Sequence, residues 1–389
     1  MKTSIIIAGD YCPQKRVATL IKGGQYELLY SGVKKIVSEA DYSLVNFECP
    51  VVTDETAPIV KCGPSLKCDT RGVDALSYCG FKAVTLANNH FRDYGDNGVL
   101  STLDELNKRC IDYVGGGRNI TEASAILFKN LKGRTFAFIN CCENEFSIAT
   151  ESRPGSNPLN IINQYHKIQE ARRRSDYVII IVHGGAEGCQ YPSPRMQNTY
   201  RFFIEVGADA VINHHQHCYS GFEYYLGKPI CYGLGNFSFD SIFPTHEKDS
   251  SIHSLWNEGY MVRLLFDDSI IKIEALPYIQ AFKEPGTIMM EGDDLSEFEK
   301  RLQIINDCIK DPSLAETQYN KWVDLNSDWH RIIFEPWGKG WRILHKKGYL
   351  PSLVSKQKWL SLADYTMCES HHDRIKRIFD LMIDKYNSQ

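Results

Sequence analysis

The chain has 389 residues, of which 43% are hydrophobic and 24% charged, and its formal net charge at pH 7 is −4. This is the composition of a globular protein that can bury a large core. The charge argues against a dedicated nucleic-acid binder, because phosphate backbones are held by clustered Lys and Arg in excess. The apolar run from Ile5 reaches Asp10 too soon for a secretory signal, and no later run approaches the ~20 apolar residues of a membrane helix. We therefore expect a cytoplasmic protein without a membrane segment.

From residue 3 to about residue 237, short β-branched runs alternate with amphipathic stretches, which predicts strands joined by crossover helices. The predicted strands cover residues 4–9, 42–47, 82–87, 135–140, 176–183, 208–213 and 228–235. Apolar residues at helical spacing predict helices over residues 26–40, 97–110, 160–175 and 194–207. Residues 223–237 and 260–278 are typical of hairpin strands, so we expect mixed rather than purely parallel sheets.

Beyond residue 292 the pattern becomes that of a helical region. Five apolar residues recur there at helical spacing: Leu295, Phe298, Leu302, Ile305 and Ile309. Five of the six tryptophans lie between residues 322 and 359. Such aromatic residues most often pack a small helical subdomain, so they do not indicate a function. We predict a sheet-containing domain at residues 1–291 and a mainly helical region at residues 292–389.

Ionisable and amide side chains stand where the predicted strands end. In chain order they are Asp10, Asn46, Glu48, Asn88, Asn89, His90, His183, His214, His215 and His217. The carboxyl ends of parallel strands meet at one edge of a sheet, so we expect these side chains to converge. Each one alone is more simply a turn residue or a satisfied buried histidine. Together, their carboxylate, amide and imidazole donors suit Mn, Fe, Zn or Mg, and a cation removes the cost of burying them unpaired.

These segments resemble those of the CapA-type capsule or poly-gamma-glutamate synthesis proteins, which belong structurally with the calcineurin-like metallophosphoesterases. The matching segments are GD at 9–10, NFECPV at 46–51, GFKAVTLANNHFRDYGDNGVLSTLDEL at 80–106, HGGAE at 183–187, GADAVINHHQH at 207–217 and GKPICYGLGNFSFD at 227–240. They occur in the family's order, within roughly residues 1–285. The resemblance implies an α/β fold of the metallophosphoesterase type, with mixed β-sheets flanked by helices in four α/β/β/α layers and a helical C-terminal extension.

The resemblance also implies roles for single residues. One or two divalent metal ions (Mn, Fe, Zn or Mg) would be bound by Asp10, Glu48, Asn89, His183, His215 and His217. Among these, Glu48 looks like the carboxylate that bridges two ions. His90 resembles the histidine that contacts the leaving group, and Asp93 is positioned to orient its imidazole. Candidates for supporting the ligands or binding substrate are Asn46, Asn88, Glu187, His214, Arg195 and Arg118. Either arginine could grip a phosphate or a glutamyl carboxylate, although surface salt bridges are the more common use.

Two local features concern the ligands, and the first bears on the number of ions. General metallophosphoesterases begin with Asp-x-His, whereas this chain has Asp10-Tyr11-Cys12, so one cation position lacks its usual histidine. His215 and His217 flank Gln216, and an extended chain would project both histidines from the same side. Occupancy by one ion or by two stays open.

The function implied by the resemblance is that of a metal-dependent hydrolase, with phosphoester hydrolysis as the leading reaction, in the biosynthesis of a capsule or poly-gamma-glutamate type of surface polymer. The substrate would be a small molecule or polymer that carries a phosphoester, or a glutamyl polymer. One alternative is hydrolysis of a gamma-glutamyl amide by the same metal chemistry. The other is a non-catalytic accessory protein that works with polymer-synthesis partner proteins. The missing Asp-x-His histidine favours the accessory role, whereas Asn89-His90 and His215-x-His217 favour an enzyme.

Overall fold

The computed structural model describes residues 2–53, 55–240, 254–267, 270–331, 340, 343–344, 347–350, 355–367, 378–379 and 383. The chain divides into two compact units, Met1–Tyr319 and Asn320–Gln389. Among the described residues, no helix combines the length and the apolar character needed to cross a bilayer.

The first sheet has eight strands, with β1 at its centre. Along the sheet the order is β16-β15-β14-β1-β2-β3-β4, and β13 pairs with β1 off this path. The strands are β1 (Thr3–Tyr11), β2 (Tyr42–Phe47), β3 (Ala83–Thr85), β4 (Asp112–Val114), β13 (Asn236–Ser238), β14 (Glu258–Asp267), β15 (Ile270–Gln280) and β16 (Thr287–Met289). Strands β1 to β4 are parallel, whereas β14 is antiparallel to β1, β15 to β14 and β16 to β15. The expected mixed sheet is therefore confirmed.

The second sheet has six strands in the order β11-β12-β10-β9-β7-β6. They are β6 (Leu127–Leu131), β7 (Arg134–Cys142), β9 (Tyr177–His183), β10 (Ala210–His214), β11 (Phe222–Tyr225) and β12 (Lys228–Cys231). Strands β7, β9, β10 and β12 are parallel, and the edge strands β6 and β11 are antiparallel to their neighbours. A small ribbon pairs β5 (Gly116–Gly117) with β8 (Gly155–Ser156).

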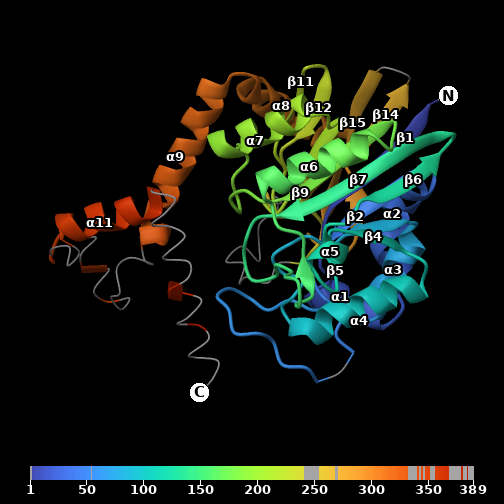
Figure 1. Cartoon of the computed structure of the whole chain (residues 1–389), viewed down its shortest axis with the longest axis horizontal. Helices are drawn as coiled ribbons and strands as arrows, with labels where there is room; N and C mark the ends of the chain where they lie inside the picture. Colours follow the sequence, from blue (N-terminus) through green and yellow to red (C-terminus); the bar gives the residue numbers. More distant parts are fainter. Residues whose placement is uncertain are drawn as a thin grey trace. The chain divides into compact units, whose positions relative to one another are not determined.

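Alternation along β1 shows how the layers are built, since successive side chains of a strand point to opposite faces. Ile5 and Ile7 belong to the core shared with the second sheet, whereas Ile6 and Ala8 belong to a second core beneath helices. That second core is covered by α1 (Lys15–Lys22), α2 (Tyr26–Ser38), α3 (Arg71–Cys79) and α4 (Gly95–Lys108). The second sheet is covered by α6 (Ile161–Arg172), α7 (Pro194–Glu205) and α8 (Gly292–Lys310). The two helical groups lie on opposite sides of the sheets (Figure 1), which confirms four α/β/β/α layers.

Helix α8 belongs to the unit that contains both sheets. Its apolar stripe is buried in the core of the second sheet, where Phe298 and Ile309 are fully buried. This packing carries the compact unit to Tyr319, past the predicted boundary after residue 291. The described part of the C-terminal region is mainly helical, with α9 (Pro312–Arg331) and α11 (Lys356–Met367). A short helix, α5 (Ile120–Ala123), stands between β5 and β6 in the chain.

Buried polar side chains join the two sheets. The imidazole of His214 in β10 donates from Nε2 to the carbonyl oxygen of Ala8 in β1, at 2.9 Å. Asn140 in β7 accepts from the backbone N–H of Ala87, just after β3, at 2.7 Å. Its amide nitrogen donates to the carbonyl of Ile181 in β9. Because buried polar groups are costly without partners, these bonds favour one relative placement of the sheets.

Strand β1 leaves no space for a side chain at Gly9. A Cβ built there would overlap the carbonyl oxygen of Gly235, which accepts a hydrogen bond from the N–H of Asp10 at 3.0 Å. We expect Gly9→Ala to lower the free energy of unfolding by about 3 kcal/mol, because overpacking a rigid backbone forces the strands apart. Gly23→Ala is the control, since its Cβ would meet nothing closer than 3.4 Å. Equal stability of the two variants in urea unfolding would contradict this packing.

Candidate metal centre

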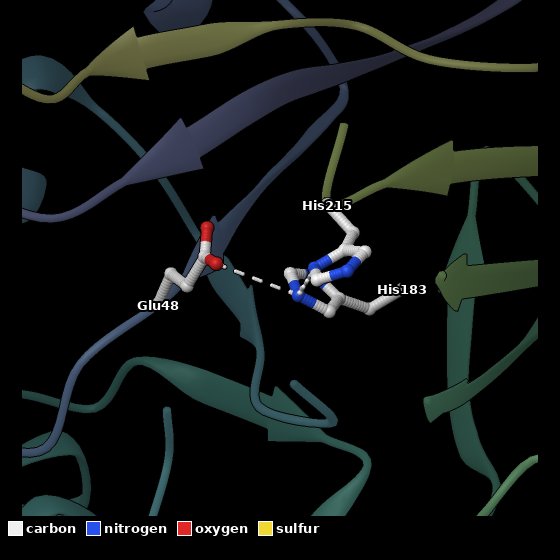
Figure 2. Close-up of side chains that lie close together, drawn as sticks. All are labelled: Glu48, His183 and His215. Atoms are coloured by element: carbon white, nitrogen blue, oxygen red, sulfur yellow. Dashed lines mark hydrogen bonds and ion pairs between the residues drawn. The ribbon is translucent and has the colours of Figure 1, made fainter. Parts of the chain in front are cut away.

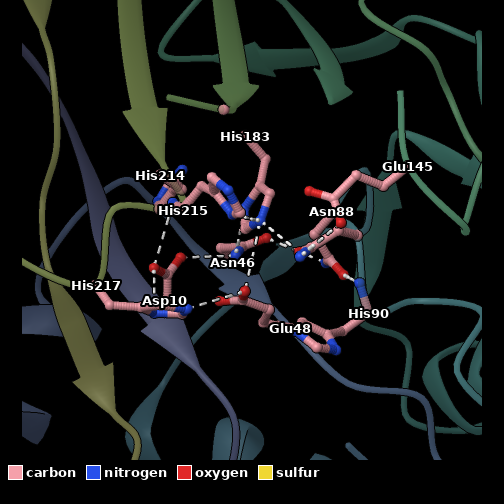
Figure 3. Close-up of polar contacts among 12 residues, drawn as sticks. Asp10, Asn46, Glu48, Asn88, His90, Glu145, His183, His214, His215 and His217 are labelled. Atoms are coloured by element: carbon pink, nitrogen blue, oxygen red, sulfur yellow. Dashed lines mark hydrogen bonds and ion pairs between the residues drawn. The ribbon is translucent and has the colours of Figure 1, made fainter. Parts of the chain in front are cut away.

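The ends of strands from both sheets meet at one place (Figure 3). Asp10 lies in β1, and Glu48 and Asn89 follow β2 and β3 of the first sheet. His183 ends β9, and His215 follows β10, in the second sheet. The side chains converge as the strand-end pattern predicts, but two sheets that face each other supply them, rather than the edge of one sheet.

The first group of donors is Glu48, His183 and His215, which are buried and have ligand atoms within 4.8 Å of one another. Figure 2 shows the Glu48 carboxylate and the two imidazoles pointing toward one another. The Nε2 atom of His183 lies 3.4 Å from Glu48 Oε1 and 3.0 Å from His215 Nδ1. It also lies 3.0 Å from the amide oxygen of Asn89. Four donor groups therefore surround one small volume.

The second group is Asp10, Glu48 and His217, whose ligand atoms also lie within 4.8 Å of one another. His217 Nδ1 is 3.5 Å from Asp10 Oδ2, and its Nε2 is 3.7 Å from Glu48 Oε1. Glu48 thus belongs to both groups. Three donors make this group poorer than the first, in keeping with the absence of a histidine at Cys12, which is packed into the core beneath the helices.

The carboxylate of Glu48 is the strongest sign that a cation fits here. The residue is 0% exposed, and neither of its oxygens has a hydrogen-bond partner among the described residues. An ionised carboxylate buried in this way is costly unless a positive charge compensates it. The carboxylate, amide and imidazole donors around Glu48 form a set that first-row divalent ions accept. The residues present therefore fit a divalent metal ion.

The charges in the two groups act strongly on one another. Burial and the neighbouring Asp10 raise the pKa of Glu48 well above its usual value. Burial alone would lower the pKa of His217, but Glu48 and Asp10 raise it to about 10. Burial and the adjacent histidines hold the pKa of His183 well below its usual value. The groups therefore strongly influence one another's charge states.

Two asparagines hold the ligands in place. The amide nitrogen of Asn46 donates to Asp10 Oδ1 at 2.7 Å and lies 3.2 Å from His183 Nδ1, so it links the two sheets. Asn88 donates from its amide nitrogen to the carbonyl of Phe47 at 2.9 Å, and its oxygen accepts from the N–H of His90. His214, another supporting candidate, makes the bond between the sheets described above.

The backbone at His215 and His217 differs from the expected extended chain. Strand β10 ends at His214, and the φ angles of His215 and His217 are 95° and 54°. Residues other than glycine adopt positive φ values only in a few per cent of cases, and such conformations cluster at functional sites. The expectation of an extended chain at these residues is therefore wrong, although both imidazoles reach the centre. The turn sends His215 toward His183 and His217 toward Asp10, one into each group.

Asp93 holds the Nδ1 side of the His90 imidazole. Its Nδ1 lies 2.7 Å from Asp93 Oδ2, and both residues are buried. A carboxylate only accepts hydrogen bonds, so the proton of this bond sits on Nδ1. The Nε2 atom is not used by this bond. Burial lowers the pKa of His90, while Asp93 acts in the opposite direction.

The remaining candidates lie in different places. Arg118 is exposed and pairs with Asp104 and Glu122, as expected of a surface salt bridge. Arg195 pairs with Glu143, whose backbone N–H donates to the carbonyl of His183, so it stands beside the centre. Glu187 is exposed but acts electrostatically on Glu48, His215 and His217.

Several residues near the centre are absent from the sequence-based candidates, among them Asn236, which contacts His217, and Glu143, Glu145 and Lys61. Glu143 and Glu145 follow the predicted strand at residues 135–140, so the strand-end rule could have found them. Glu145 accepts a hydrogen bond from the amide nitrogen of Asn89 at 3.4 Å. Lys61 pairs with Asp93 and lies in a segment without a repeating pattern, so the sequence gives no signal for it.

The chain is similar to known proteins over most of its length. Residues 4–241 match a family described as bacterial capsule synthesis protein PGA_cap. The chain is 29% identical over 259 residues to the capsule biosynthesis protein CapA of Bacillus anthracis, covering 64% of this chain and 63% of that protein. It is 30% identical over 253 residues to the PGA biosynthesis protein CapA of Bacillus subtilis (strain 168), covering 64% and 66%. The matches thus span slightly less than two thirds of each relative.

A solved structure described as a novel phosphatase from Mycoplasma pneumoniae is also similar, with a TM-score of 0.45 and 15% identity over 78% of this chain and 99% of that chain. The family match covers more than half of the chain. The protein therefore belongs to the bacterial capsule synthesis protein family PGA_cap.

Proposed function

We propose that the protein is a metal-dependent hydrolase that cleaves phosphoesters. The observation that carries this proposal is the Glu48 carboxylate, which is fully buried, has no hydrogen-bond partner among the described residues, and is shared by two groups of donors. Neither a folded core nor a scaffolding surface requires such a group. A site for cations that act on a substrate does.

The ligands would be the two groups described above. Glu48, Asn89, His183 and His215 would hold one ion, and Asp10, Glu48 and His217 would hold a second, more weakly bound ion. A divalent ion in this place supplies Lewis acidity, which polarises a phosphoryl oxygen and acidifies water. The side chains of Asn46 and Glu145 would keep Asp10 and Asn89 oriented for binding.

His90 would assist departure of the leaving group. Asp93 fixes the Nδ1 end of the imidazole, so when the ring is protonated its Nε2 carries the proton that would be given to the alcohol oxygen leaving phosphorus. Arg195, beside the centre, is free to meet a phosphate or a carboxylate of the substrate once it leaves Glu143.

The biological setting is proposed from the relatives. The two similar CapA proteins are named for capsule and PGA biosynthesis. We infer that the substrate is a small molecule or polymer with a phosphoester, met during synthesis of a surface polymer, and that polymer-synthesis proteins are partners. The amide-hydrolase and accessory alternatives are separated from this proposal by the assays below.

Metal binding is expected in two events of unequal strength, because ligand number favours the four-donor group. In calorimetric titration of chelator-treated protein with Mn²⁺, His215→Gln should weaken the tighter event about 100-fold. Asp10→Asn should remove the weaker event and retain the tighter one.

His166→Gln is the control, since His166 is an exposed histidine on α6. A wild-type protein without Mn²⁺ affinity, or His215→Gln binding Mn²⁺ as the control does, would contradict the metal centre.

Turnover is expected with p-nitrophenyl phosphodiesters or monoesters in the presence of Mn²⁺. Glu48→Gln should reduce hydrolysis to background, since both ions lose a ligand. His90→Ala should lower kcat by a factor of ~10²–10⁴ with Mn²⁺ affinity unchanged, as expected for loss of a general acid.

The same preparations, incubated with poly-gamma-glutamate, report amide cleavage as newly formed amines. Amine release without phosphoester turnover would replace the proposal by the amide hydrolase. No turnover of either substrate by Mn²⁺-loaded wild-type protein would favour the accessory protein.

A further inference from the structure

Lys61 is a buried cation that the proposed reaction does not use. It lies between β2 and α3, in residues 55–67, which form no helix or strand. Its side chain is only 3% exposed, although the preceding Val60 is 73% exposed. Lysine is rarely buried unless it is paired, so this inward placement needs a cause.

The cause is Asp93. The Lys61 ammonium lies 2.6 Å from Asp93 Oδ1 and 3.2 Å from His90 Nδ1. It also lies 6.0 Å from the centre of the Phe146 ring. Asp93 is 0% exposed, and among the described residues its Oδ1 has no hydrogen-bond partner other than the Lys61 ammonium that pairs with it.

Asp93 also contacts other residues of segment 55–67, as well as His90. Asp93 Oδ2 accepts from the N–H of Leu66 at 2.7 Å, and the Asp93 carbonyl accepts from the N–H of Ile59 at 2.8 Å. The same Oδ2 holds the imidazole of His90. Because an ammonium only donates, and His90 Nδ1 already donates to Asp93, Lys61 acts on the imidazole through the carboxylate.

We propose that Lys61 is a positioning residue, which fixes the Asp93 carboxylate and thereby the orientation of the His90 imidazole. Removing one partner of a buried ion pair leaves an uncompensated charge, which then moves or is neutralised. Asp93 would lose its fixed place, and His90 would lose the group that orients it. The effect of Lys61 on turnover rests on the proposed function, whereas the effect of Lys61 on the orientation of the His90 imidazole does not.

The test uses the full-length protein with Lys61→Met, which keeps the length of the side chain and removes its charge. Lys61→Arg is the conservative variant. Lys67→Met is the control, because Lys67 is an exposed lysine of the same segment, with its ammonium 5.1 Å from the Tyr94 ring.

The first readout is the Nδ1–H resonance of His90 in protein labelled with ¹⁵N-histidine, assigned by its loss in His90→Gln. The wild type, Lys61→Arg and Lys67→Met should show a resonance that exchanges slowly with water. In Lys61→Met it should broaden, or exchange about tenfold faster. An unchanged resonance in Lys61→Met would overturn the proposal, whether or not the protein hydrolyses anything.

The second readout separates positioning from folding. Lys61→Met should lower kcat about tenfold, with KM and Mn²⁺ affinity within about twofold of the wild type, and Lys61→Arg should recover most of the loss. A loss of kcat accompanied by an equal loss of Mn²⁺ affinity, without rescue by arginine, would show a structural role and overturn the proposal. If Mn²⁺-loaded wild type has no hydrolase activity, the proposed function fails, and the resonance alone decides the role of Lys61.

Discussion

The buried carboxylate of Glu48 is the interaction on which the rest of the centre depends. It follows β2, between two sheets, and neither oxygen has a hydrogen-bond partner among the described residues. A charge in this position costs on the order of several kcal/mol unless it is compensated. The surrounding groups are those that would hold a compensating cation: His183, His215 and the amide oxygen of Asn89 in one group, and Asp10 with His217 in the other. Cation binding, rather than the packing of the core, therefore accounts for the polar side chains in this region.

Two sheets must keep a constant relation for this arrangement to persist, because each donor group draws on both. The bond from His214 to the carbonyl of Ala8 and the contacts of Asn46 with Asp10 and His183 cross between them. Around these polar contacts lies a continuous apolar core, to which α8 contributes its buried stripe. Burial of apolar side chains thus brings the two sheets together, and a few directional hydrogen bonds fix their relative placement.

The sequence predicts much of this architecture because strands and helices repeat with different periods. All seven predicted strand segments and all four predicted helices occur, and the residues at the strand ends converge. Several short elements were not anticipated, among them α1, α3 and β6, since short segments carry few repeats of a pattern. Periodicity also cannot tell which sheet a strand joins, so the division of the donors between two sheets emerges only from long-range packing.

Other features depend on local conformation that no pattern encodes. The left-handed backbone at His215 and His217 reverses the simple expectation for an extended chain. The sequence does not reveal Lys61 as part of the site, because its segment is irregular. Its burial depends on its ion pair with Asp93, which stands 32 positions later in the sequence. The Asp10-Tyr11-Cys12 segment is readable from the sequence, but only the structure shows Cys12 packed in the core beneath the helices.

Anomalous X-ray diffraction from crystals grown with Mn²⁺ tests the central claim most directly. The account predicts an anomalous peak at the manganese absorption edge within coordination distance of Glu48, His183 and His215, and a second, weaker peak beside Asp10 and His217. Well-ordered side chains with no anomalous peak among them, or a peak elsewhere on the molecule only, would contradict it.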